Sequence, residues 1–152
     1  MNSVELIKEV FHPEPYPTQE RELEHTLLHL SRESVGKSKY ILLVSRIDEA
    51  TDLKSLIQSQ KKELRKYYNA RVWKGVGVIE ILIGKHAHWE DKVSDVKPDW
   101  HGLQSIILQG LLFIDPDSKK HKLTQSHWGP IRFGNFQGQM DKVHYLLGKL
   151  GA

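Results

Sequence analysis

The chain has 152 residues, of which 39% are hydrophobic and 27% are charged, and its formal net charge is +3. This composition is typical of a single soluble globular domain, 1–152, and no apolar run reaches the roughly 18 residues of a membrane span. The absence of cysteine excludes disulfides, thiolate catalysis and cysteine-ligated zinc, and it fits a cytoplasmic protein.

The beginning of the chain predicts two helices joined by a proline-rich connector. A helix is expected from Ser3, because the apolar residues that follow it have helical spacing. Three prolines between residues 13 and 17 end this helix, so residues 1–17 are expected to form an N-terminal arm. A second helix is expected from Thr18 to about Ser34. Its buried stripe would consist of Leu23, Leu27 and Leu30.

The next segment predicts a β-α-β crossover at 39–83. Residues 39–47, KYILLVSRI, are apolar on both faces, which is typical of a strand covered on two sides. Residues 51–68 place their apolar side chains within about a 120° arc, which predicts an amphipathic helix. Residues 76–83 form a second apolar strand. Because the strands are joined through a helix, they are expected to be parallel.

The C-terminal part has a weaker pattern. We expect a short helix or irregular segment, a strand from about 110 to 115, a return strand near 121–127 and a loop at 128–138. A closing helix follows, with apolar residues at Met140, Val143, Leu146, Leu147 and Leu150. The predicted fold class is α/β or α+β. It is a single layered domain with a central mixed sheet of four to five strands, two N-terminal helices and a C-terminal helix.

Positive charge is concentrated in and after the helix at 51–68. Residues 1–36 carry three basic and seven acidic side chains, whereas residues 51–75 carry seven basic and two acidic ones. A basic helix face can neutralise phosphates or contact an acidic partner, which could also be the chain's own N-terminal region. The alternative is an ordinary solubilising surface. The candidate binding residues are Lys54, Lys61, Lys62, Arg65, Lys66, Arg71 and Lys74.

Two polar residues interrupt surfaces that are predicted to be buried. Gln60 lies in the apolar stripe of the 51–68 helix, where a buried amide needs hydrogen-bond partners; a structural role is favoured over a ligand cavity. Glu80 interrupts the second apolar strand, where an acid must be paired or bind a metal. Nucleases of the restriction-enzyme type place a lysine two positions after such an acid, but position 82 is leucine. A structural role, as an edge-facing residue or in an ion pair with Arg46 or Arg71, is therefore favoured over catalysis.

A histidine-rich segment, GKHAHWED, follows the strand at 76–83. On an extended backbone the side chains of His86 and His88 would face the same side, with roughly 6.6 Å between their Cα atoms. Two imidazole rings at this spacing can bind one metal ion. Ligands also commonly bind at the ends of strands in α/β sheets. The candidate metal ligands are His86, His88 and His101. The pocket candidates are Glu80, Trp89, Trp100, His127 and Trp128.

These features predict a soluble binding or accessory module that presents a basic helix to nucleic acid or to an acidic protein, with no membrane partner. One alternative is a small metal-dependent hydrolase or nuclease that uses the segment 86–101. Another is a structural subunit of a homo-oligomer. No cofactor is required for the first function, whereas the hydrolase would need a divalent metal. No catalytic residue is assigned, and enzymatic activity stays an open question.

Overall fold

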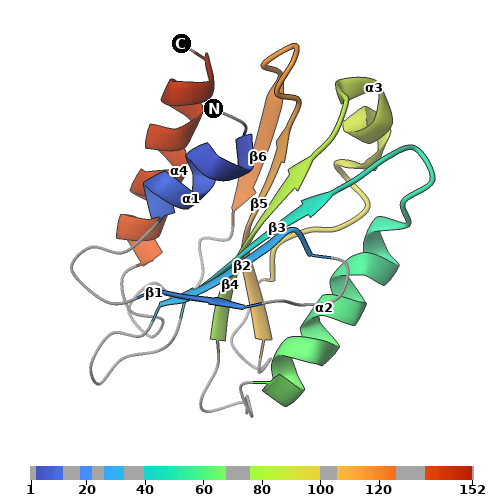
Figure 1. The fold of residues 1–152 in the computed structure, drawn as a ribbon. Helices are drawn as coiled ribbons and strands as arrows, with labels where there is room; N and C mark the ends of the chain where they lie inside the picture. Colours follow the sequence, from blue (N-terminus) through green and yellow to red (C-terminus); the bar gives the residue numbers. More distant parts are fainter. Residues whose placement is uncertain are drawn as a thin grey trace.

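A six-stranded mixed sheet forms the centre of the molecule in a computed structural model of the chain (Figure 1). The strands lie in the sheet in the order in which they occur in the sequence. The structure describes residues 3–11, 18–21, 26–32, 40–67, 76–99, 106–125 and 136–151. The strands are β1 (Thr18–Arg21), β2 (Leu28–Arg32), β3 (Tyr40–Arg46), β4 (Val76–Ile83), β5 (Ile106–Ile114) and β6 (His121–Gln125). The helices are α1 (Ser3–Phe11), α2 (Leu53–Tyr67), α3 (His86–Trp89), the 3-10 helix η1 (Glu90–Lys92) and α4 (Phe136–Gly151).

The β3–α2–β4 unit confirms the predicted crossover. β3 and β4 are adjacent and parallel, and Tyr40 pairs with Gly77. α2 begins after Asp52, whose side-chain oxygen accepts a hydrogen bond from the backbone N–H of Ser55 at 3.1 Å. This bond satisfies one of the amide donors that every helix leaves free in its first turn. Both the strands and the helix were predictable because their periodicities are local properties of the sequence.

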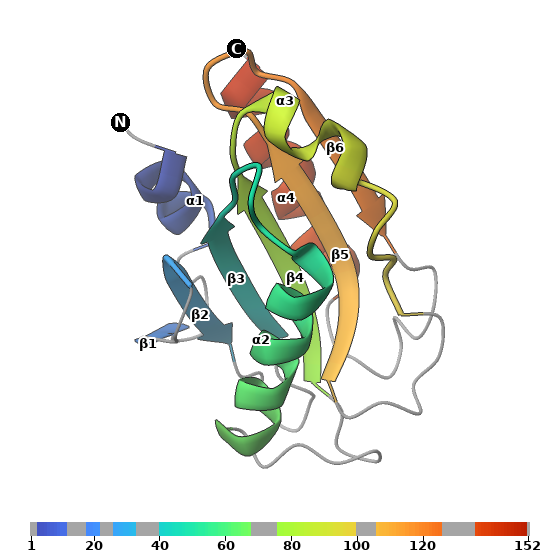
Figure 2. The ribbon, with the colours of Figure 1, turned by 90° about the vertical axis from the view of Figure 1, so that its right-hand side faces the viewer.

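Helices cover both faces of the sheet (Figure 2). α2 and α3 pack on one face, and α1 and α4 pack on the other. β3 serves both cores, because Ile41 and Leu43 belong to the α2 side whereas Leu42 and Val44 belong to the α1 and α4 side. Each side chain of this size that is fully buried contributes roughly 1.5–3 kcal/mol to stability. The apolar character of β3 at both parities is therefore explained by its central position.

The prediction of a second N-terminal helix is wrong. Within the range Thr18–Ser34, the described residues form β1 and β2, which pair antiparallel with each other. β2 also pairs antiparallel with β3. The β2 sequence LHLSR alternates apolar and polar residues, which is the period of a strand, and its pairing satisfies the backbone groups on one edge of β3. The sheet consequently has six strands where four to five were expected.

The C-terminal half contains the predicted hairpin and closing helix, with different bounds. β5 begins at Ile106, not near residue 110, and all nine of its residues are buried between β4 and β6. The turn to β6 lies at 116–118, and Lys119 follows it with a φ of 63°. The left-handed conformation at that residue brings the chain into the return strand. Residues 136–138, expected in a loop, open α4.

Candidate functional site

The two histidines after β4 lie on a short helix and not on an extended segment. His86 and His88 both belong to α3, where residues two apart point roughly 200° apart around the axis. The prediction that their rings face the same side is therefore wrong. The ring of His86 lies edge-on against Trp89, with 4.7 Å between centroids. Its Nδ1 lies 3.8 Å from Oε2 of Glu90.

The described ranges contain no group of three or more His, Asp or Glu side chains that could hold a metal ion. His101 lies outside these ranges, so a metal site that includes it stays a prediction. Three of the pocket candidates also lie outside the described ranges: Trp100, His127 and Trp128.

Asp115, which was not singled out in the sequence, links the loops at the carboxyl ends of β4 and β5 through hydrogen bonds to its side chain. Its carboxylate accepts hydrogen bonds from the backbone N–H groups of His86 at 2.9 Å, Asp117 at 2.9 Å and Ser118 at 3.2 Å. These bonds, the one from His86 foremost, lower the pKa of Asp115 to about 2. The bond to His86 also satisfies a free amide at the start of α3 and stabilises the first turn of this helix.

Trp89, one of the pocket candidates, is a core residue. It is 2% exposed, and its indole N–H donates to the carbonyl oxygen of Gly84 at 2.9 Å. Its ring stacks on Phe113 at 5.4 Å between centroids. These contacts give it a structural role beneath α3, as expected for a tryptophan whose N–H finds a partner inside the protein.

Glu80 lies in the middle of β4, beneath α2, and is 1% exposed. Its Oε1 accepts a hydrogen bond from the hydroxyl of Ser45 at 2.9 Å. Burial raises the pKa of Glu80 to about 7, while the side chains of Ser45 and Gln60 act in the opposite direction. The predicted ion pair with Arg46 is not formed, because Arg46 is exposed and these partners of Glu80 are neutral. Arg71 lies outside the described ranges.

Gln60 connects α2 to the sheet. It is 2% exposed, and its Nε2 donates to Oγ of Ser45 at 2.8 Å and to Oγ1 of Thr26 at 3.2 Å. These bonds agree with the structural role that its position predicts. Sequence reasoning missed both partners, although Ser45 has the same strand parity as the buried Leu43 and is polar in an otherwise apolar run.

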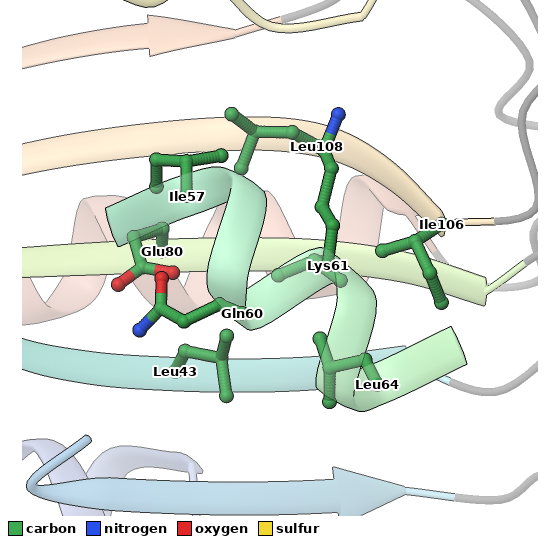
Figure 3. Close-up of a pocket in the computed structure, with 9 residues that line it drawn as sticks. Leu43, Ile57, Gln60, Lys61, Leu64, Glu80, Ile106 and Leu108 are labelled. Carbon is green, nitrogen blue, oxygen red and sulfur yellow. The ribbon is translucent and has the colours of Figure 1, made fainter. Parts of the chain in front are cut away.

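A cavity of about 10 Å³ lies between α2 and the sheet, lined by Glu80, Gln60, Lys61 and apolar residues (Figure 3). This volume is close to the smallest that holds one water molecule, so the cavity has no room for an organic substrate. Lys61 is held beside it, because its Nζ lies 2.8 Å from Oδ2 of Asp99. The same Oδ2 accepts a hydrogen bond from the backbone N–H of Leu108 at 2.7 Å.

The basic residues of α2 divide between two environments. Four exposed cations on the side away from the sheet form what we call the basic face: Lys54, Lys62, Arg65 and Lys66. They lie within about a 120° arc and extend over about 18 Å of the helix axis. Lys61 is not part of this face, since it is 20% exposed and paired with Asp99. The remaining predicted cations, Arg71 and Lys74, lie outside the described ranges.

No protein-family model, no curated protein and no solved structure matches the chain. Among the described residues, no helix combines the length and the apolar character needed to cross a membrane. Function is therefore inferred from the geometry and charge of the described residues.

Proposed function

We propose that the chain is a binding or accessory module whose basic face binds the phosphate backbone of a nucleic acid. The observation that supports this proposal is the segregation of charge on α2. All of its exposed charged side chains are cations, and its one acid, Glu63, is half-buried. The opposite side of α2 is fixed to the sheet by buried residues such as Leu53, Ile57 and Leu64. The cations are therefore presented on a rigid element.

The dimensions of the basic face suit a nucleic-acid strand. A face of about 18 Å spans roughly five nucleotide steps, since phosphates along one strand follow each other at about 3.4 Å of axial rise. Ser55, Gln58 and Ser59 are exposed on the same side of α2 and can donate hydrogen bonds to phosphate oxygens. Contacts of this type carry no base-sequence information. The proposed binding is consequently sequence-independent and driven by counterion release.

The acidic N-terminal helix does not compete for the basic face. Charge asymmetry pointed to the N-terminal region as one partner of the cations. α1 packs through Ile7 on the face of the sheet opposite to α2. Residues 3–11 therefore leave the basic face accessible, and an acidic protein is the alternative partner that we retain.

The proposal is tested by the anisotropy of labelled DNA and RNA oligonucleotides titrated with the protein at low salt. Wild type should bind, and a variant with Lys62, Arg65 and Lys66 all changed to glutamate should not. None of these three residues contributes to the buried side of α2, so the variant is expected to keep the fold. Circular dichroism checks that expectation.

A second triple variant controls for net charge. Lys120, Lys122 and Lys149 are exposed outside α2, and reversing all three changes the net charge by the same amount. This control should retain binding. An equal loss of oligonucleotide binding in both variants would mean that only the overall charge matters. If wild type did not bind, the basic face would have to contact an acidic protein or serve only as a solubilising surface.

A further inference from the structure

The side chains around Glu80 form a network whose hydrogen atoms can be counted. The amide nitrogen of Gln60 has two N–H groups, and it donates to Ser45 at 2.8 Å and to Thr26 at 3.2 Å. Ser45 has one O–H group, and it donates to Oε1 of Glu80 at 2.9 Å. These three bonds use both N–H groups of the amide and the one hydrogen of Ser45. None of these three bonds joins Gln60 directly to Glu80, and the lowering effect of Gln60 on the Glu80 pKa belongs to an amide that donates to the ionised carboxylate.

The amide oxygen of Gln60 is the unsatisfied atom of this network. It is buried and has no hydrogen-bond donor among the described residues. Figure 3 shows this oxygen turned toward the carboxyl group of Glu80, while the amide nitrogen points away from it. With an ionised carboxylate, two acceptors would face each other inside the protein. A protonated carboxyl group instead has an O–H group that supplies the missing donor.

We propose that Glu80 is an interior proton-binding site whose protonation state controls the hydrogen bonds between α2 and the sheet. In the protonated state Glu80 donates to the amide oxygen of Gln60, and the amide nitrogen is free to hold Ser45 and Thr26. When the proton is released to solvent, the carboxylate requires donors. The Gln60 amide then turns over to donate to Glu80, and it gives up its bonds to Ser45 on β3 and to Thr26 ahead of β2.

The surroundings of Glu80 favour the neutral form. Among the described residues that line the cavity beside Glu80, the other charged group is Lys61 of α2, whose Nζ lies 2.8 Å from Oδ2 of Asp99. β3 contributes the neutral Ser45, and β5 contributes apolar side chains such as Leu108. Burial is accordingly the dominant influence, and it raises the pKa of Glu80 from 4.5 to about 7. Glu80 is therefore expected to release its proton near neutral pH.

The test is an NMR titration of the whole chain, labelled with ¹³C at the glutamate carboxyl groups and with ¹⁵N at the glutamine amides. Wild type should show one carboxyl resonance with a midpoint near pH 7, which the Glu80→Gln variant lacks. That midpoint corresponds to a proton affinity about 300-fold above the ordinary glutamate value. The Gln60 side-chain amide should shift with the same midpoint in wild type and stay constant in the variant.

A matched control is Glu49→Gln, which removes an exposed glutamate and should leave both titrations unchanged. A Glu80 carboxyl that titrates near its ordinary value, or a Gln60 amide that does not respond at the Glu80 midpoint, would overturn the proposal. Glutamine has the same shape as protonated glutamate, so the Glu80→Gln variant is expected to fold. If it does not fold, the response of the Gln60 amide in wild type decides the question.

Discussion

Replacing Glu80 by glutamine should remove a pH-dependent loss of stability. The pKa of Glu80 is about 7 in the folded chain and 4.5 for the ordinary group. Because the folded state holds the proton more tightly, its contribution to stability is complete below pH 4.5 and is lost as the pH rises through 7. A difference of about 2.5 pH units corresponds to roughly 3 kcal/mol, at about 1.36 kcal/mol per unit.

The assay is urea unfolding of wild type, Glu80→Gln and the exposed control Glu49→Gln across this pH range. The free energy of unfolding of wild type should fall by about 3 kcal/mol relative to Glu80→Gln between pH 4.5 and values above 7. Glu49→Gln should follow wild type at every pH. If the curves of wild type and Glu80→Gln were parallel instead, Glu80 would not be the buried acid described above.

Two further predictions concern the loops and α4. A Cβ at Gly84 would lie 2.5 Å from the backbone oxygen of Ile47, so Gly84→Ala should destabilise the fold by about 1–3 kcal/mol. A Cβ at Gly148, which lies in α4, would meet no atom within 4 Å, so Gly148→Ala should stabilise the fold by about 0.5–1 kcal/mol. Thermal melts of both variants check these expectations. Asp115→Ala should cost about 2 kcal/mol in urea unfolding near neutral pH, and Asp117→Ala much less, because Asp115 accepts three backbone N–H bonds. Since the pKa of Asp115 is lowered from 3.8 to about 2, this cost should be full above pH 3.8 and disappear as the pH falls through 2; a constant cost at all pH values would contradict the assignment.

The β3–α2–β4 unit could be predicted because each of its elements has a periodicity that is visible within a short window. The N-terminal region could not, because the spacing of its leucines fits a helix as well as other arrangements. The strand form of β2 depends on β3, which offers an edge for pairing at a distance in the sequence. A competition between local periodicity and tertiary pairing is decided by contacts that sequence patterns do not contain.

The candidate site was predictable in part. Gln60 and Glu80 stood out because each is polar where its neighbours on the same surface are apolar. Their connection through Ser45 depends on the register of β3 against β4 and on the rotation of α2, which only the folded chain defines. The geometry of His86 likewise depends on Asp115, a residue 29 positions later in the chain.

The most direct test of nucleic-acid binding by the basic face is the dependence of affinity on salt. Binding constants of wild type for a single-stranded oligonucleotide would be measured over a series of salt concentrations. If all four cations of the basic face contact phosphates, the slope of log K against log salt should be about −3, since each contact contributes about −0.7. A slope near zero, or no binding at low salt, would contradict the proposed function.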